Sequence, residues 1–350
     1  RISERFGDPS QQCQACFVLA NYLNHWVNHL RDADDLNARG YEAGLAAGEM
    51  QWTGYIAAYK LFYPFYRGVN IDAIQREIPD LLVFTRRTKN QWAIDTLQGL
   101  QMALTDLNNP SHDGTDPDGA ENEHLTYTNE DDYLASCGRN SSSGAIGRYA
   151  ILKAQTCFLL GKFDEALEAV NMAQNFLGFI SCSISVAEHN FYHSLILSAL
   201  HKRVSEDRKD HFVEIVKTNQ RQMRIWATHC PENFEHQYLL VQAELTRIAG
   251  QDMAAMRLYE AAIASARTNG FVQHEGLAYE LAAKFYEERG FDTIARTYLR
   301  EARSCYVRWG AERKVAQLES EHPEVQEQRQ KLPSRAFETH VGQLDGIAVV

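Results

Sequence analysis

The stretch from Phe271 to Gly310 constrains the fold more than any other part of this chain. Its first half carries an apolar stripe at helical spacing, formed by Ala278, Leu281, Ala282, Phe285 and Tyr286. Gly290 interrupts this helix, and a second apolar stripe follows at Ala295, Leu299 and Ala302. Such a helix–turn–helix unit cannot bury its apolar face alone. The pattern therefore predicts neighbouring units that stack on it and form a helical solenoid.

Turn glycines and small side chains repeat along the chain. Gly250 and Gly290 are separated by about one helical-repeat period, and Gly161 marks an earlier turn of the same kind. Alanines recur where paired helices approach each other, at Ala154, Ala166, Ala173, Ala243, Ala255 and Ala262. Only 8 prolines and 21 glycines occur in 350 residues, which favours helix. We therefore expect an all-α protein, a right-handed α-solenoid of tetratricopeptide-like helical hairpins.

The helical pattern divides the chain into four parts. We expect residues 1–108 to form N-terminal hairpins of the array, and residues 145–322 to form tetratricopeptide-like repeats. Residues 109–144 are rich in Pro, Gly, Asn and Asp and carry no Lys or Arg in their first two thirds. This composition predicts an acidic, partly disordered loop with one short helix near Glu130–Ser136. Residues 323–350 are expected to be a linker toward a downstream domain.

Helix boundaries follow from the stripes and from the residues that interrupt them. In the N-terminal part we expect helices over residues 10–30, 33–47, 50–67, 71–88 and 90–108. In the C-terminal part we expect helices over residues 142–160, 163–178, 186–203, 208–228, 233–249, 252–268 and 311–320, besides the Phe271–Gly310 pair. The motif from His229 to Asn233 contains Pro231, which stops one helix and lets the next begin, so we interpret it as a connector.

Composition limits the classes of partner. The formal net charge of −11 argues against a nucleic-acid partner, because neutralising phosphates requires basic clusters. No uncharged apolar run is long enough to predict a membrane span, and the N-terminus lacks the apolar core of a signal peptide. The 7 cysteines show no framework spacing, which favours a reducing, cytoplasmic location. Because the chain begins with Arg1 rather than Met, we expect a segment of a longer protein.

Several short motifs could carry chemistry, but each lacks part of what that chemistry needs. A phosphate-binding loop requires Gly-Lys followed by Ser or Thr, whereas Gly161-Lys162 is followed by Phe163. The CxxC motif of Cys13 and Cys16 lacks a second ligand pair. Two histidine pairs at helical spacing could bind metal or form hydrogen bonds between helices: His25 with His29, and His189 with His193. We expect no cofactor and no metal in this segment.

A more specific resemblance runs from Val216 to Gly250 and through the final repeat, and it includes N-terminal motifs at residues 24–30 and 40–45, so it spans nearly the whole chain. It rests on Asn219, Gln220, Met223, Trp226, Ala227, His229, Pro231, Asn233, Phe234, His236, Ala243, Glu244, Arg247 and Gly250, then on residues 280–286 and 308–311. These residues resemble the helical region of large signalling ATPase–kinases. Such proteins carry a serine/threonine kinase-like domain, an AAA- or STAND-type NTPase, helical repeats, a GAF sensor and often a histidine kinase. The family's nucleotide-binding and phosphoacceptor residues lie outside this segment.

The resemblance implies a non-catalytic binding and coupling arm of a signal-transduction protein. Its partners would be a protein, a peptide or adjacent domains of the same chain. In solenoids the first helix of each repeat tends to line the concave surface. We therefore expect exposed, partner-binding side chains there, at Gln237, Glu244, Arg247, Glu280, Lys284 and Glu287.

Two alternatives remain open from the sequence. One is a freestanding adaptor scaffold. The other is an α/α-toroid hydrolase, which needs two carboxylates about 5–10 Å apart. The acidic loop offers Asp131 with Asp132, or Glu121 with Glu123. An open superhelix favours the arm, whereas a closed barrel with a carboxylate-lined pit favours the enzyme.

Overall fold

The computed structural model describes residues 7–109, 127 and 129–326 of the chain. Most of these residues lie in helices, and no strand occurs among them. The expected disordered stretch of the acidic loop, apart from its flanks, lies outside the described residues. Of the expected linker, residues 323–326 are described, and they form a 3₁₀ turn at Pro323–Val325 with Val325 buried. No helix in the described part combines the length and apolarity needed to cross a bilayer.

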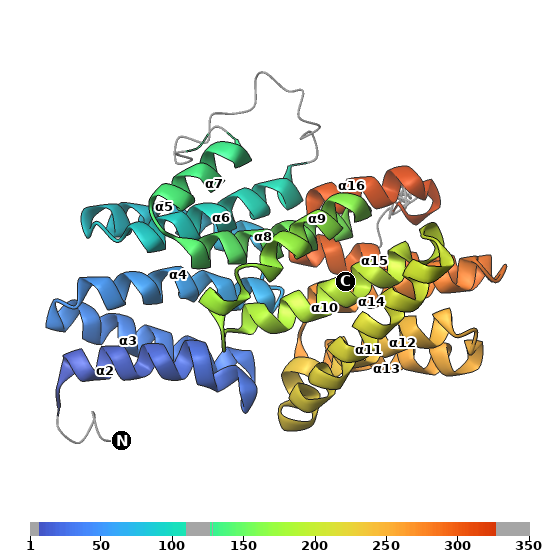
Figure 1. Cartoon of the computed structure of the whole chain (residues 1–350), viewed down its shortest axis with the longest axis horizontal. Coiled ribbons are helices and arrows are strands. Elements are labelled where there is room, and N and C mark those ends of the chain that lie inside the picture. The colour runs from blue at the N-terminus through green and yellow to red at the C-terminus, as the bar shows by residue number, and fades with distance from the viewer. Residues whose placement is uncertain (1–6, 110–126, 128, 327–350) are drawn as a thin grey trace, which may run out of the picture.

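The helices follow one another with short connections (Figure 1). The N-terminal helices are α2 Pro9–Val18, α3 Ala33–Ala47, α4 Met50–Tyr66, α5 Ile71–Arg87, α6 Gln91–Asn108 and α7 Glu130–Arg139. The repeats contain α8 Ser143–Leu159, α9 Phe163–Gln174, α10 Ile184–Leu200, α11 Glu206–His229, α12 Pro231–Ile248, α13 Asp252–Asn269, α14 Val272–Glu287, α15 Asp292–Trp309 and α16 Glu312–Glu321. The short helix expected near Glu130 is present as α7, and α8 begins within the expected loop.

Consecutive helices pack as hairpins, which confirms the all-α solenoid expected from the sequence. Gly250 and Gly290 occupy the turns of the α12–α13 and α14–α15 hairpins with φ of 70° and 77°, a conformation that strongly favours glycine. The helices of the last hairpin approach closely at Gly276, where an added Cβ would lie 2.9 Å from Cys305 Cβ. Glycines therefore both reverse the chain and permit close packing.

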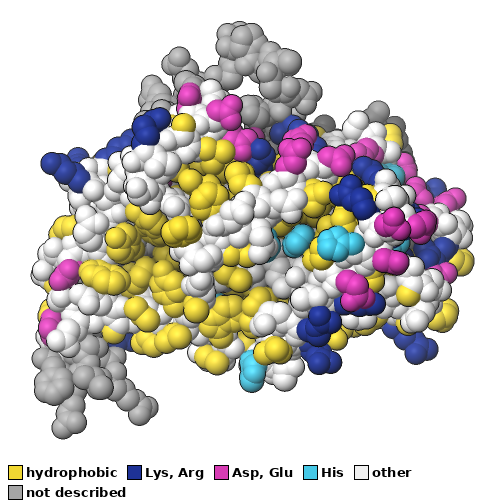
Figure 2. Space-filling view, viewed as in Figure 1, with side chains coloured by type: hydrophobic (Ala, Val, Ile, Leu, Met, Phe, Trp, Pro, Cys, Tyr) yellow, Lys and Arg dark blue, Asp and Glu magenta, His cyan; other side chains and the backbone are white. Residues whose placement is uncertain are grey.

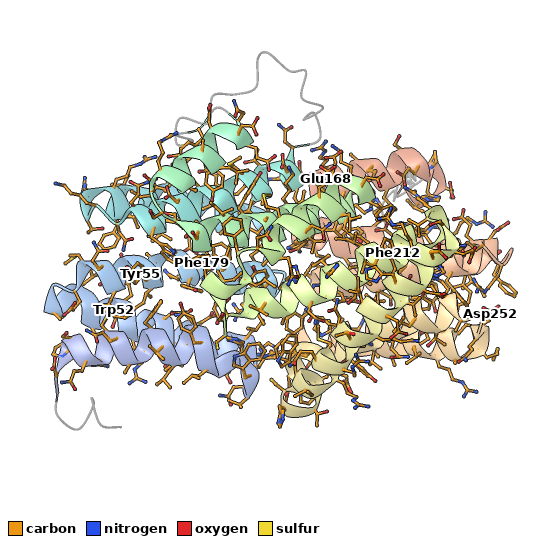
Figure 3. All side chains as sticks on the ribbon, in the orientation of Figure 1. Trp52, Tyr55, Glu168, Phe179, Phe212 and Asp252 are labelled. Atoms are coloured by element: carbon orange, nitrogen blue, oxygen red, sulfur yellow. The ribbon has the colours of Figure 1, made fainter. Side chains whose placement is uncertain are left out.

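Aromatic rings fill the space among the N-terminal helices. Trp52 and Tyr55 of α4, labelled in Figure 3, have ring centroids 5.9 Å apart. Tyr55 in turn lies 5.1 Å from Trp92 of α6, and Phe17 of α2 lies 5.4 Å from Trp52. These contacts make one aromatic layer that joins α2, α4 and α6.

The helix expected over residues 10–30 is wrong beyond α2. A π-helical turn spans Leu19–Leu23, a 3₁₀ turn spans Asn24–Trp26, and the chain becomes helical again only at Leu30. A distant side chain holds the end of this irregular segment, residues 25–30, in place. Asn233 Nδ2 donates to the carbonyls of His25 and Asn28 at 2.9 and 2.8 Å, and Asn233 Oδ1 accepts from the Leu30 N–H at 3.0 Å. Backbone groups that would otherwise pair within a helix are thus bonded to α12.

The array folds back on itself, so its repeats contact more than their neighbours. Gln273 Nε2 of α14 donates to the Tyr66 carbonyl of α4 at 2.6 Å, and Asn70 Nδ2 donates to the Arg308 carbonyl at 3.1 Å. The Trp309 ring lies 5.9 Å from Phe65. The largest hydrophobic cluster consequently runs from α2 to α16, and two smaller clusters lie around Tyr133 and Ile151. Near the centre, α10 contacts α4 through Ser185 and Tyr66 (Figure 1).

We predict that Asn233→Ala lowers the free energy of unfolding by about 3 kcal/mol, because it leaves two buried backbone groups and one part-buried group without partners. Urea unfolding followed by circular dichroism measures this change. Asn175→Ala, which alters an exposed asparagine on the surface, is the control and should change stability little. Equal stability of the two variants would contradict the anchoring role of Asn233.

Candidate functional site

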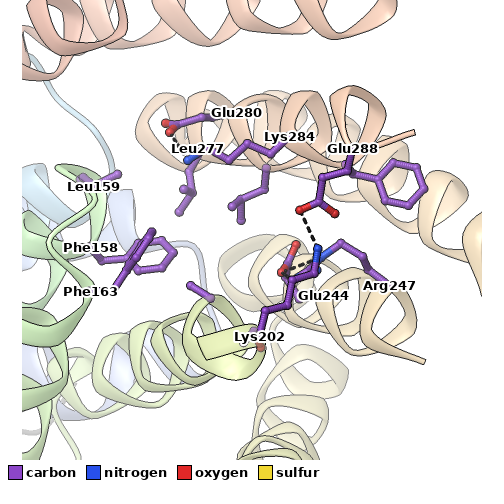
Figure 4. Close-up of a pocket in the computed structure, with 14 residues that line it drawn as sticks. Phe158, Leu159, Phe163, Lys202, Glu244, Arg247, Leu277, Glu280, Lys284 and Glu288 are labelled. Carbon is purple, nitrogen blue, oxygen red and sulfur yellow. Dashed lines mark hydrogen bonds and ion pairs between the residues drawn. The ribbon is translucent and has the colours of Figure 1, made fainter. Parts of the chain in front are cut away.

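A cavity of about 210 Å³ lies where the C-terminal ends of α8, α10, α12 and α14 meet (Figure 4). Its apolar walls are formed mainly by Phe158, Phe163, Leu277, Leu281 and Phe285. Its charged side chains are Lys202, Glu244, Arg247, Glu280, Lys284 and Glu288. The cavity therefore combines an apolar interior with a charged rim, the arrangement usual for a recognition pocket.

Every carboxylate of this rim is paired with a cation. Lys202 Nζ lies 2.8 Å from Glu288 Oε1, and Arg247 Nη2 lies 2.6 Å from Glu244 Oε2. Lys284 Nζ lies 2.7 Å from Glu280 Oε1. The basic members sit near helix C-termini, where the partial negative charge of the helix favours cations.

Glu280 is the most strongly held of these carboxylates. Although it is only 3% exposed, it accepts hydrogen bonds from Lys284, from Lys314 at 2.9 Å and from the Tyr306 hydroxyl at 2.7 Å. Burial alone would raise the pKa of Glu280, but the two ammonium groups and the hydroxyl hold this pKa well below its usual range. Glu280 is therefore ionised and fixed in place.

The structure brings four of the sequence-predicted residues together. Glu244, Arg247, Glu280 and Lys284 all line the cavity, whereas Glu287 lies outside it on α14. Their binding role stays a prediction.

The expectation that all six side chains are exposed is wrong for three of them. Gln237, Glu244 and Glu280 are buried, because the array folds back and covers the inner helices with other helices. Arg247 is half-buried, while Lys284 and Glu287 are exposed.

Sequence reasoning missed a buried polar cluster between α10, α12 and α14. Gln237 Nε2 donates to Glu188 Oε1 at 2.7 Å, and His274 Nε2 lies 3.8 Å from Glu188 Oε2. The facing ring nitrogens of His236 and His274 are 2.8 Å apart. Burial raises the pKa of Glu188 to about 8 and lowers the pKa of His274 to about 3. No repeat pattern marked this cluster, since His236 and His274 stand at different positions of their helices.

Three of the four histidines that were candidates for metal binding make hydrogen bonds to other segments, and the fourth, His193, lies 5.5 Å from the His189 ring. His25 uses both ring nitrogens, toward the Tyr63 hydroxyl at 3.0 Å and the Cys182 carbonyl at 3.1 Å. His29 Nε2 lies 3.0 Å from the Asn269 carbonyl, and His189 Nε2 lies 3.1 Å from the Val170 carbonyl. Across residues 7–109, 127 and 129–326, no group of three metal-ligating side chains is assembled.

The remaining sequence motifs lie at positions that contribute to packing or to turns. Cys13 and Cys16 are buried on α2, and burial raises the pKa of the Cys13 thiol to about 11, which disfavours the reactive thiolate. Pro231 begins α12 directly after α11 ends, which agrees with the connector interpretation. Gly161 lies in the turn before α9 with a φ of 73°.

The array closes back on α4, unlike an open superhelix, but the described carboxylates nominated for the toroid alternative, Asp131 and Asp132, line no pit. Asp131 and Asp132 are exposed in the first turn of α7, and Glu121 and Glu123 lie outside the described residues. A glycosidase acid requires a raised pKa, whereas cations surround Glu280 in the cavity and lower its pKa.

Comparisons with known proteins agree with the repeat architecture. Residues 131–281, from α7 into α14, match a family described as CHK1-like, TPR repeats. A Dictyostelium discoideum protein described as hybrid signal transduction histidine kinase G is 28% identical over 214 residues. This similarity covers 51% of the chain but 6% of the relative, so the chain spans a small part of that protein's length. The tetratricopeptide-like repeats expected from the sequence are thereby confirmed.

We predict that Glu280→Gln lowers the free energy of unfolding by about 3 kcal/mol, because Lys314 is left buried without its counter-charge. Replacing Lys314 as well, by Met, should recover most of the loss. Thermal and urea unfolding measure both effects. Glu287→Gln, on the exposed side of the same helix, is the matched control. If the double variant is less stable than Glu280→Gln, the buried ion pair is not the cause.

Glu188 should make stability depend on pH above neutrality. Its folded pKa of about 8 exceeds the unfolded value, so the folded state retains a proton that the unfolded state releases. Stability from this group therefore falls as pH rises, by about 1 kcal/mol between pH 7 and 8. Glu188→Gln should remove this contribution. The buried histidines titrate below this window because their pKa values are lowered.

Urea unfolding of the wild type and of Glu188→Gln at pH 7 and pH 8 measures the effect. The difference between the two proteins isolates Glu188 from all other groups. Parallel pH dependences would mean that Glu188 is already ionised in the folded protein.

Proposed function

We propose that this chain is a non-catalytic binding and coupling arm of a signal-transduction protein, working through protein–protein or interdomain contacts. The observation that carries this proposal is the repeat match over residues 131–281 together with the similarity to a signal-transduction histidine kinase. Tetratricopeptide-type arrays expose extended surfaces that suit peptides and other domains. The relative's kinase activity is not assigned to these helices.

The cavity at the ends of the inner helices is the proposed contact point. Its volume of about 210 Å³ is below the usual range of about 300–1,000 Å³ for small-molecule pockets. Liquid water of the same volume contains about seven molecules. This space suits one large apolar side chain of a partner segment, packed against Phe158, Leu281 and Phe285. The ion pairs at the rim can then exchange partners with charged residues on either side of that side chain.

The larger protein is part of the same proposal. By resemblance, an NTPase switch and a downstream kinase would respond to binding at this arm, in the cytoplasm. Binding can act in this way only if it favours one arrangement of arm and switch over another. A freestanding adaptor would use the same cavity without the switch.

Lysine acetylation of the full-length gene product tests the proposal. Lys202 and Lys284 flank the cavity and are 63% and 47% exposed, while Lys60, 48% exposed on α4, serves as the internal control. We predict that Lys202 and Lys284 react roughly fivefold more slowly in the full-length protein than in the isolated 1–350 chain. A slowing of this size corresponds to a partner segment present at about four times its Kd for the cavity. Lys60 should react equally in both.

Ala199→Trp is the matched variant, because Ala199 lines the cavity and an indole there would fill it. This variant should restore the reactivity of Lys202 and Lys284 in the full-length protein. Equal reactivity of both lysines in the two wild-type samples would argue against an interdomain contact at the cavity.

A further inference from the structure

A second hollow, of about 730 Å³, lies between α11 and α12. We propose that this α11–α12 groove binds an acidic peptide segment of a protein partner. The groove is separate from the cavity described above, because Glu244 and Arg247 face the cavity whereas Gln242, Leu245 and Thr246 line the groove on the other side of α12.

One wall of the groove is a row of cations. Lys217, Arg221 and Arg224 follow one another at helical spacing on α11, so they lie on one face, and all three are exposed. Arg221 donates to the Thr218 hydroxyl at 2.8 Å. Neither Arg221 nor Arg224 forms a salt bridge within the described part of the chain. Two guanidinium groups are therefore available for carboxylates.

Lys217 does have a partner, but a weak one. Its Nζ lies 2.7 Å from Glu214 Oε1, and both side chains are more than half exposed. Exposed pairs of this kind contribute little, so an incoming carboxylate can replace Glu214.

This positive patch is unusual for the chain. The whole protein has a formal net charge of −11. Between residues 201 and 224, however, basic side chains outnumber acidic ones: Lys202, Arg203, Arg208, Lys209, Lys217, Arg221 and Arg224 against Glu206, Asp207, Asp210 and Glu214. Figure 2 shows Lys and Arg side chains gathered over α11. Such a local excess attracts and orients an acidic partner.

The opposite wall gives the groove apolar and amide contacts. Tyr238, Leu245 and Ile248 of α12 are half-buried there. Gln220 Nε2 reaches across the floor to the Tyr238 carbonyl at 3.0 Å and to Gln242 Oε1 at 3.3 Å, which holds the two helices together. A peptide with alternating acidic and apolar side chains can therefore place its carboxylates on α11 and its apolar groups on α12.

The dimensions and charge distribution favour a peptide over a nucleic acid. The groove extends along α11 from Lys209 to Arg224, about 22 Å at the helical rise, which accommodates about seven residues of an extended peptide. Glu206 and Asp210 line its other end. A nucleic acid carries negative charge along its whole length and would be repelled there, whereas a peptide can confine its carboxylates to the Lys217–Arg224 half.

Fluorescence anisotropy with the full chain and a labelled heptapeptide, Glu-Leu-Glu-Leu-Gln-Leu-Gln, whose carboxylates lie at one end, tests the proposal. We expect saturable binding that weakens as salt is raised. The triple variant Lys217→Glu, Arg221→Glu, Arg224→Glu should weaken binding about tenfold or more. A control triple variant with the same charge change at exposed sites elsewhere is Arg76→Glu, Arg87→Glu, Arg257→Glu, and should bind within about twofold of wild type.

Three outcomes would overturn the proposal: equal loss in the control triple variant, binding that does not respond to salt, or displacement of the peptide by single-stranded DNA of equal charge at lower concentration. Arg221→Gln with Arg224→Gln provides a milder variant should the charge reversals disturb the fold, and should still weaken binding. Ala199→Trp should leave peptide binding unchanged. The peptide experiment therefore tests the groove alone, and its failure would not contradict the cavity proposal.

Discussion

The packing of the inner helices against one another is the interaction on which the rest of this structure depends. A solenoid could remain open, but here α14 and α15 return to α4 through Gln273 and Trp309. Asn233 fastens the irregular segment after α2 at the same time. Because buried backbone groups need partners, this closure depends on specific hydrogen bonds as well as on apolar contacts.

Closure also explains why charged side chains are buried inside a repeat array. Once the inner faces are covered, carboxylates on them must be paired or neutral. Both solutions occur. Glu244 pairs with Arg247, and Glu280 pairs with Lys314. Within the described ranges Glu188 accepts a hydrogen bond from the Gln237 amide, and burial raises its pKa. The cavity is left where the helix ends diverge and the packing is incomplete.

Local sequence signals predicted most helices but little of their tertiary arrangement. Gly250 and Gly290 identified hairpin turns, because positive φ is a property of the local backbone. The irregular segment at residues 25–30 was not predictable locally, since the side chain that binds its backbone, Asn233, is far away in the chain. The exposure of Gln237 and Glu280 was misjudged for the same reason. Helical periodicity distinguishes one face of a helix from the other, but it does not reveal which other helices will cover the polar one.

The two proposed contact surfaces share α12, and this sharing has a physical consequence. Arg247 faces the cavity and Tyr238 faces the groove, while His236 and Gln237 join the same helix to α14 and α10. A rigid helix transmits displacement along its length, so a ligand that shifts α12 in the groove must alter the cavity or break these buried hydrogen bonds. Binding in the groove therefore changes the affinity of the cavity only if it shifts α12, and only by as much as the shift alters the hydrogen bonds of His236 and Gln237. Asn233, in the first turn of α12, bonds the backbone of residues 25–30, so a movement of α12 would have to break these hydrogen bonds as well.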